Sequence, residues 1–199
     1  MYPLLLRKEA LMMRNSFINS SIRRQEEKDY FVASRVLKDN FNSSHMTVET
    51  YPTPESYYVD MFGVTKDDTE KEVKFNVEIK ERNKSLQYIQ DSPFAELKVS
   101  KYNRMRSVTE DGVKLYYMVL LNGQLCLLYD LDNPDVWKNV EIRDWEMKRT
   151  QFSDDSDKVI VKTYFIPYSN ATFTADCTSI YKDWYTNGLD KKDKDKESL

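Results

Sequence analysis

The sequence contains little glycine, two cysteines and a single histidine, and each scarcity argues against a class of function. Only 4 of the 199 residues are glycine, and neither GxGxxG nor GxxxxGK[ST] occurs, which argues against a glycine-rich nucleotide-binding loop. Cys126 and Cys177 are isolated, so they offer neither a disulfide framework nor a zinc-binding spacing. His45 lies in a polar segment and is expected at the surface, which argues against catalysis by a Ser-His or Cys-His pair.

Long apolar runs are also absent, and no excess of positive charge is present. No segment approaches the roughly 20 apolar residues of a membrane-spanning helix. The short apolar run at the start is followed directly by charge, unlike a signal peptide. We therefore expect a cytoplasmic protein with no membrane partner. Because the formal net charge is −3, attraction to nucleic acid would have to come from a local basic patch.

The sequence does contain enough apolar material for a core. Hydrophobic residues make up 40% and aromatic residues 13%, and the length favours one domain. We expect a single domain over residues 1–188, with a core at about 21–130 and an elaboration at 131–188. The charged residues 189–199 are expected to form a disordered tail. Four aromatic residues are interpreted as core rather than as surfaces for base stacking: Tyr116, Tyr117, Trp137 and Trp145.

The periodicity of apolar residues predicts a mixed α/β (α+β) fold. A short helix is expected within residues 1–19. The helical period predicts further helices at 21–40 and, after Ser92 and Pro93, at 94–108. Charged residues 65–71 predict a turn, and the segment after Asp130 is weakly patterned apart from a strand at 159–165. Strands of the central sheet are expected at 46–52, 56–63, 73–82, 114–121 and 124–130. Short connections make the first three strands an antiparallel meander, and the intervening helix makes the next connection a parallel crossover.

Two acidic residues and one lysine form the most informative pattern in the sequence. Glu78 and Lys80 are two apart on a predicted strand, so both project from the face opposite Ile79. Asp60 lies in an otherwise apolar predicted strand, where an ionised carboxylate is costly unless it is paired or binds a cation. If these strands are neighbours, Asp60 and Glu78 can converge on Mg²⁺ or Mn²⁺. Taken alone, however, Glu78 and Lys80 are typical of a solvated strand face.

This pattern, within the order helix, three strands, helix and strand, resembles the PD-(D/E)xK nuclease superfamily over residues 21–129. That superfamily includes restriction endonucleases, Holliday-junction resolvases and phage exonucleases. The resemblance implies a restriction-endonuclease-like core that hydrolyses phosphodiester bonds with a divalent metal ion. It assigns the metal to Asp60, Glu78 and the backbone carbonyl of Ile79, with Lys80 as the motif lysine. Val59 stands where members of the superfamily often have proline.

The resemblance also implies supporting residues and a substrate. The acidic residue of the first helix maps to Glu26 by helical phase, with Glu27 as the alternative, and the polar residue of the following helix maps to Lys101. We expect a metal-dependent endonuclease acting on DNA rather than RNA, and a homodimer is compatible with this. The alternative is a catalytically silent module that binds nucleic acid or has a structural role. Six cations are expected to line the substrate cleft: Arg23, Arg24, Arg82, Lys84, Lys98 and Arg104.

Overall fold

The computed structural model describes residues 20–53, 58–148 and 158–188, so the helix predicted within residues 1–19 and the tail predicted at 189–199 lie outside the described residues. The helices are α2 (Ser20–Phe41), α3 (Leu86–Asp91), α4 (Val99–Val108) and α5 (Thr178–Asp183). The strands of the main sheet are β1 (Met46–Pro52), β2 (Met61–Asp67), β3 (Glu72–Arg82), β5 (Lys114–Leu121), β6 (Leu125–Asp130) and β9 (Phe173–Asp176). A second sheet contains β4 (Phe94–Lys98), β7 (Glu141–Lys148) and β8 (Lys158–Pro167).

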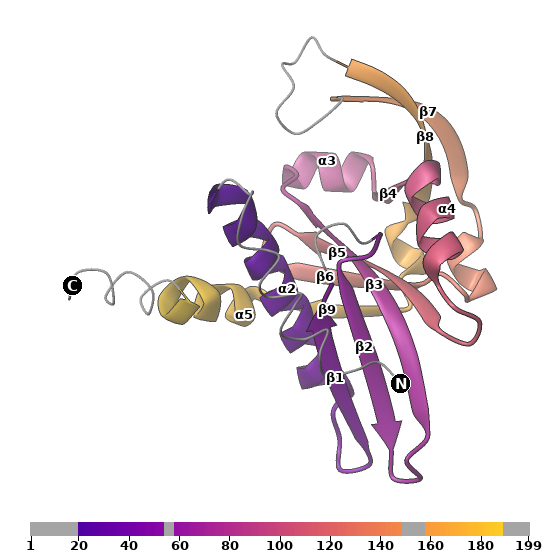
Figure 1. Cartoon of the computed structure of the whole chain (residues 1–199). Helices are drawn as coiled ribbons and strands as arrows, with labels where there is room; N and C mark the ends of the chain where they lie inside the picture. The colour runs from indigo at the N-terminus through magenta and orange to yellow at the C-terminus, as the bar shows by residue number, and fades with distance from the viewer. Residues whose placement is uncertain (1–19, 54–57, 149–157, 189–199) are drawn as a thin grey trace.

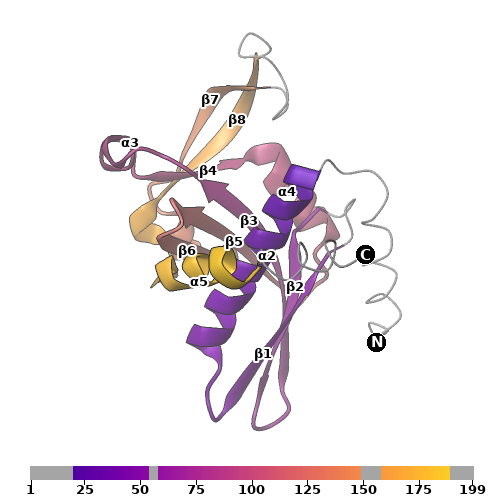
Figure 2. The ribbon, with the colours of Figure 1, turned by 90° about the vertical axis from the view of Figure 1, so that its left-hand side faces the viewer.

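The main sheet is mixed and is flanked by helices, as predicted. Its strand order is β1-β2-β3-β5-β6-β9, with β3 and β5 parallel and the other neighbours antiparallel. Residues from α2 and α5 pack on one face, and residues from α4 and the second sheet pack on the other (Figures 1 and 2). The central strand β3 therefore presents its side chains alternately to two separate cores. No helix among the described residues is long and apolar enough to cross a membrane.

The first half of the chain follows the predicted order. Strands β1, β2 and β3 form the expected meander, and the parallel pairing of β3 with β5 confirms the crossover. The β5–β6 hairpin turns at Asn122 and Gly123, whose φ values of 51° and 64° are those of the tight turn that favours these two residue types. These local signals and the apolar strands between them are enough to specify the centre of the sheet.

Two predicted boundaries are wrong. The strand predicted at 56–63 begins only at Met61 and continues to Asp67, into the predicted turn at 65–71. The helix predicted at 94–108 is a strand, β4, followed by the shorter helix α4. Its first residues alternate with the period of a strand, because Ala95 and Leu97 are buried in the core while Lys98 is exposed. Ser92 ends α3 instead of beginning a helix.

The segment after Asp130 forms most of the second sheet. The strand predicted at 159–165 is present as β8, which pairs with β4 on one side and β7 on the other. The chain then returns to the main sheet through β9 and α5, neither of which the sequence pattern predicted. The second sheet thus brings together chain segments from both sides of α4.

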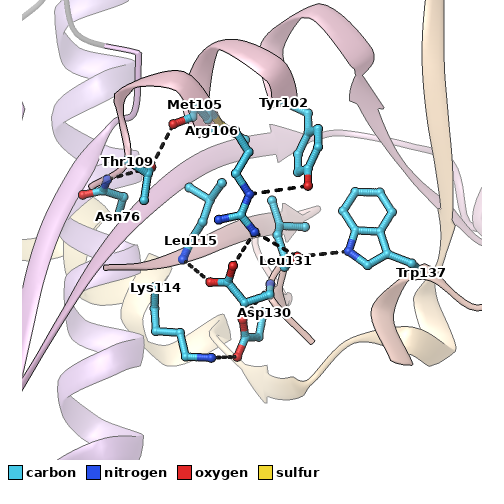
Figure 3. Close-up of polar contacts among 11 residues, drawn as sticks. Asn76, Tyr102, Met105, Arg106, Thr109, Lys114, Leu115, Asp130, Leu131 and Trp137 are labelled. Carbon is cyan, nitrogen blue, oxygen red and sulfur yellow. Dashed lines mark hydrogen bonds and ion pairs between the residues drawn. The ribbon is translucent and has the colours of Figure 1, made fainter. Parts of the chain in front are cut away.

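The C-terminal end of α4 is tied to the main sheet by a set of polar contacts (Figure 3). The Asn76 side chain of β3 donates to Thr109 Oγ1 at 3.1 Å, and Thr109 Oγ1 donates to the Met105 carbonyl at 2.8 Å. Arg106 forms an ion pair with Asp132, which also accepts from the backbone N–H of Leu115 at 2.9 Å. These contacts fix α4 over the same face of β3 from which Glu78 projects.

The close approach of β2 and β3 gives a prediction for stability. A Cβ atom on Gly63 would lie 1.9 Å from Cζ of the buried Phe75 ring, so Gly63→Ala should lower the free energy of unfolding by about 1–3 kcal/mol. Urea denaturation measures this change. Combining Gly63→Ala with Phe75→Leu should cost less than the sum of the two single changes, because the smaller side chain leaves room for the methyl group. Strict additivity would contradict this explanation.

Candidate functional site

Asp60 is held at the point where β2 begins, beside the middle of β3. Its backbone N–H donates to the Val77 carbonyl at 3.0 Å, and its carbonyl accepts from the Thr53 N–H at 3.2 Å. Its Oδ2 atom accepts from the backbone N–H of Ile79 at 2.7 Å. The side chain is therefore fixed against β3 by a charge-assisted hydrogen bond, while the residue remains exposed to solvent.

Glu78 projects from β3 toward α4 and is only 6% exposed. Burial, together with the negative charge of the nearby Asp60, raises the pKa of Glu78 well above its ordinary value. Because Asp60 Oδ2 accepts from the N–H of Ile79, the residue next to Glu78, the two carboxyl groups lie close together. The structure thus brings the two predicted acidic residues together.

Two lysines accompany the carboxylates. Lys101 Nζ, from α4, lies 2.8 Å from Glu78 Oε2, an ion pair that leaves this fully buried oxygen without a well-aligned hydrogen bond. Lys80 lies two residues after Glu78 on the same face of β3 and is exposed. Among the described residues Lys80 forms no ion pair. One lysine therefore offsets the charge of Glu78, and the other stands at the solvent side of the site.

On the first helix, Asp29 is half-buried whereas Glu26 is exposed. The expectation that Glu26 lies on the buried face of α2 is wrong, because Glu26 is exposed. The face that packs on the sheet runs through Val32 and Ala33, so one turn earlier it contains Lys28 and Asp29. Burial, together with the charges of Glu81 and Asp60, raises the pKa of Asp29 to about 7. Asp29 is therefore an acidic residue of α2 that lies within electrostatic range of Asp60.

Asp29 belongs to a polar network between α2, β3 and α5 that the sequence analysis missed. Glu81 accepts from Lys28 Nζ at 2.7 Å and from the Tyr181 hydroxyl at 3.0 Å, and the Gln25 side chain also contacts it. Gln25 donates in turn to Asp29 at 2.8 Å. Two signals in the sequence point to this network. Lys28 and Asp29 lie on the line of the apolar stripe of α2. Glu81, two residues after Ile79, projects from the same face of β3.

The predicted cations divide into two groups. Lys98, at the end of β4, has its pKa lowered by burial and then by the charges of Lys80 and Arg82, which places these three cations near one another. Glu96 pairs with Arg82 at 3.7 Å and with Lys84 at 3.3 Å.

The other group is dispersed. The Arg104 guanidinium lies 5.9 Å from the centre of the exposed Tyr58 ring, near the bend that contains Asp60. Arg24 is exposed on α2, which packs on the opposite face of the sheet. The Arg23 side chain lies outside the described residues.

The oxygen atoms of Asp60 and Glu78 are the groups at this site that suit a divalent cation. No group of three or more His, Cys, Asp and Glu residues in the described part of the chain is arranged to hold a metal ion. Magnesium, however, typically takes one or two carboxylates and completes its octahedron with water and substrate phosphate. The buried Glu78 Oε2, which lacks an aligned hydrogen bond, and the repulsion between the two carboxylates fit a small cation between them.

Comparisons with known proteins give a structural likeness that is weak. No family model matches the sequence, and no curated protein sequence matches it. Among solved structures, the chain is similar to the Holliday junction resolvase Hjc from Archaeoglobus fulgidus, an archaeal hyperthermophile. The two share 10% identity with a TM-score of 0.36, over 67% of this chain and 88% of the resolvase chain. A likeness this low assigns no function to the chain.

The raised pKa of Glu78 gives a prediction for stability in EDTA. The folded state retains a proton that the unfolded state releases, so the free energy of unfolding should fall as the pH rises from about 5 to about 8. Glu78→Gln should flatten this fall and be more stable than the wild type at pH 8. Asp29, whose pKa is raised to about 7, contributes a slope of the same sign in both proteins up to that pH. Urea denaturation across this pH range measures the effect, and an unchanged slope in Glu78→Gln would contradict it.

Proposed function

We propose that this chain is a metal-dependent nuclease that hydrolyses phosphodiester bonds, with DNA as its substrate. The observation that carries the proposal is the buried Glu78 carboxylate beside Asp60, with Lys80 exposed on the same face of β3. A solvated strand face, the alternative interpretation of the sequence, would not bury Glu78. Buried carboxylates with strongly shifted pKa values are typical of functional sites.

The residues present fit a bound Mg²⁺ or Mn²⁺ ion. Asp60 and Glu78 would hold it through carboxylate oxygens. The Ile79 carbonyl is a further ligand candidate, because its N–H already faces Asp60 and the pairing of β2 with β3 ends at Met61 and Val77. The N–H and C=O of one residue project to the same side of a strand, so the Ile79 carbonyl is also directed toward Asp60.

The protein's own groups would divide the chemistry among them. A bound divalent ion supplies polarisation of the scissile phosphate and a lower pKa for a coordinated water. Lys80 would orient the attacking water or stabilise negative charge that develops on the phosphate oxygens. Lys101 neutralises Glu78 when no other cation is near. When a bound metal ion offsets the charge of Glu78 instead, Lys101 would be free to contact the substrate. Lys98 and Arg82 would hold phosphates beside the cleaved bond.

The direct test is cleavage of plasmid DNA, single-stranded DNA, branched DNA and RNA with Mg²⁺, Mn²⁺ or EDTA. We expect DNA cleavage that requires the metal ion, and Lys80→Ala should reduce its rate by about 100-fold or more. Lys74→Ala is the matched control, because Lys74 lies on the same face of the same strand but six residues away. It should cleave like the wild type.

The result that would overturn the proposal is defined by the same assay. If the folded wild-type protein cleaves none of these substrates with either metal ion, the chain is not a nuclease. The alternative would then be a nuclease-like module that binds nucleic acid without cutting it. Equal losses in Lys80→Ala and Lys74→Ala would instead show that the rate depends on general charge and not on the site.

The structure also predicts which acidic residue of α2 supports the site. Asp29→Asn keeps the hydrogen bond from Gln25 but removes a charge near Asp60, so it should raise the Mg²⁺ concentration needed for half-maximal cleavage by about tenfold. Glu26→Gln, on the exposed side of the same helix, should leave this concentration unchanged. A larger effect from Glu26→Gln would restore the original assignment of the helix acid.

A further inference from the structure

Strands β7 and β8 extend well beyond the third strand of their sheet. Strand β4 ends at Lys98, which pairs with Thr163, but β8 reaches back to Lys158 and pairs with β7 as far as Lys148. We call this two-stranded extension, together with the last row of the three-stranded part, the arm; it comprises residues 143–148 and 158–163. In Figure 1 it projects from the body of the protein on the side of α4. The arm lies in the segment after Asp130, for which the PD-(D/E)xK resemblance assigns no role.

The two faces of the arm differ in chemistry. On one face, the exposed Ile160 lies among charges that pair with each other, Lys162 with Asp144 at 3.4 Å and Lys158 with Glu146 at 3.1 Å. The other face, which we call the inner face, is formed by side chains that the strand register places together. Its half-buried apolar residues are Trp145, Met147, Val159 and Val161.

The inner face is continuous with the cations of the proposed site. The register places Lys98, Thr163 and Arg143 in one row across the three strands, on the same face as Trp145. The backbone of Lys98 is thus about 10 Å from the backbone of Arg143 on β7, which is two strand spacings away. Lys98 itself lies near Lys80 and Arg82. Among the described residues neither Lys98 nor Lys80 forms an ion pair, so this border of the arm carries positive charge.

We infer that the inner face of the arm binds an unpaired stretch of nucleic acid next to the bond that is cleaved. This inference rests on the proposed function, and it narrows the substrate to one with a single-stranded segment at the site. Trp145 stacks on an unpaired base, and Lys98 and Lys80 hold the neighbouring phosphates. A groove that combines cations with an aromatic side chain binds single strands, because every base has a flat apolar surface. A duplex buries those surfaces and presents phosphates, which do not complement an apolar row.

Trp145 has the surroundings that stacking requires. Its ring packs edge-on against Phe165 at 5.2 Å between centroids, and the Arg143 guanidinium lies 4.7 Å from the same Phe165 ring. These contacts fix the indole on a rigid strand while leaving it partly exposed. A preorganised aromatic side chain loses little conformational entropy on binding. The expectation from sequence that Trp145 is core is therefore revised: it is anchored in the sheet but borders solvent.

The test measures binding in Ca²⁺ of a labelled single-stranded 20-nucleotide DNA and of the blunt duplex of the same sequence. Trp145→Ala should weaken binding of the single strand by about tenfold and leave duplex binding unchanged, and Trp145→Phe should retain most of the affinity. Ile160→Ala, on the opposite face of the same arm, is the matched control and should behave like the wild type. Lys98→Ala should reduce the salt slope of single-strand binding by about 0.7.

A second measurement needs no substitution. Photocrosslinking of the wild-type chain to a single strand that contains 5-iodouridine should join the strand to the peptide that includes Trp145. The inference is overturned if Trp145→Ala and Ile160→Ala have equal effects, if single-strand and duplex binding fall together, or if the crosslink maps away from the arm. If the wild type cleaves nothing but single-strand binding still depends on Trp145, the nuclease proposal fails while the binding surface stands.

Discussion

The Glu78 side chain leaves the central strand of the main sheet and enters a core whose other members are apolar. An ionised carboxylate in such a place is stable only beside positive charge, and here the Lys101 ammonium is in direct contact with it. Asp60 adds a second negative charge at the same point, held there by the Ile79 N–H. The placement of α4, the bend before β2 and the polar contacts that fix Thr109 all serve to keep these groups together.

The opposite face of β3 carries a second acidic residue, Glu81, whose surroundings differ from those of Glu78. Glu81 is also largely removed from solvent, but Lys28, Tyr181 and Gln25 all contact it, so its charge is offset by a network that joins α2, β3 and α5. Glu78 has one lysine and a like-charged neighbour. The arrangement around Glu81 is that of a structural ion pair with satisfied hydrogen bonds. The arrangement around Glu78 leaves negative charge that a bound cation would offset. Two acidic residues three positions apart on one strand therefore differ in chemistry because they face different cores.

The sequence predicts the centre of this structure well and its periphery poorly, for physical reasons. The strict alternation around Ile79 and the Asn122–Gly123 turn are local signals, so β3 and the β5–β6 hairpin were predicted correctly. Strand β4 was predicted as helix, because five residues that precede a real helix carry too short a pattern to separate the two periods. Lys101, the side chain that pairs with Glu78, could be named from the resemblance to the nuclease superfamily, but the burial of Asp29 depends on how α2 packs, which no local pattern fixes. Of the arm, the β8 strand was predicted at 159–165, but β7 was missed because Trp145 stands among charged residues that show no clear alternation.

The central claim is that a divalent cation binds between Asp60 and Glu78. Crystals of the full chain grown with Mn²⁺, examined by anomalous scattering from manganese, test it without reference to activity. The account predicts an anomalous peak within about 2.5 Å of a carboxylate oxygen of each residue, with Lys101 displaced from Glu78. Manganese bound elsewhere only, with the Lys101 ammonium still paired to Glu78, would contradict it.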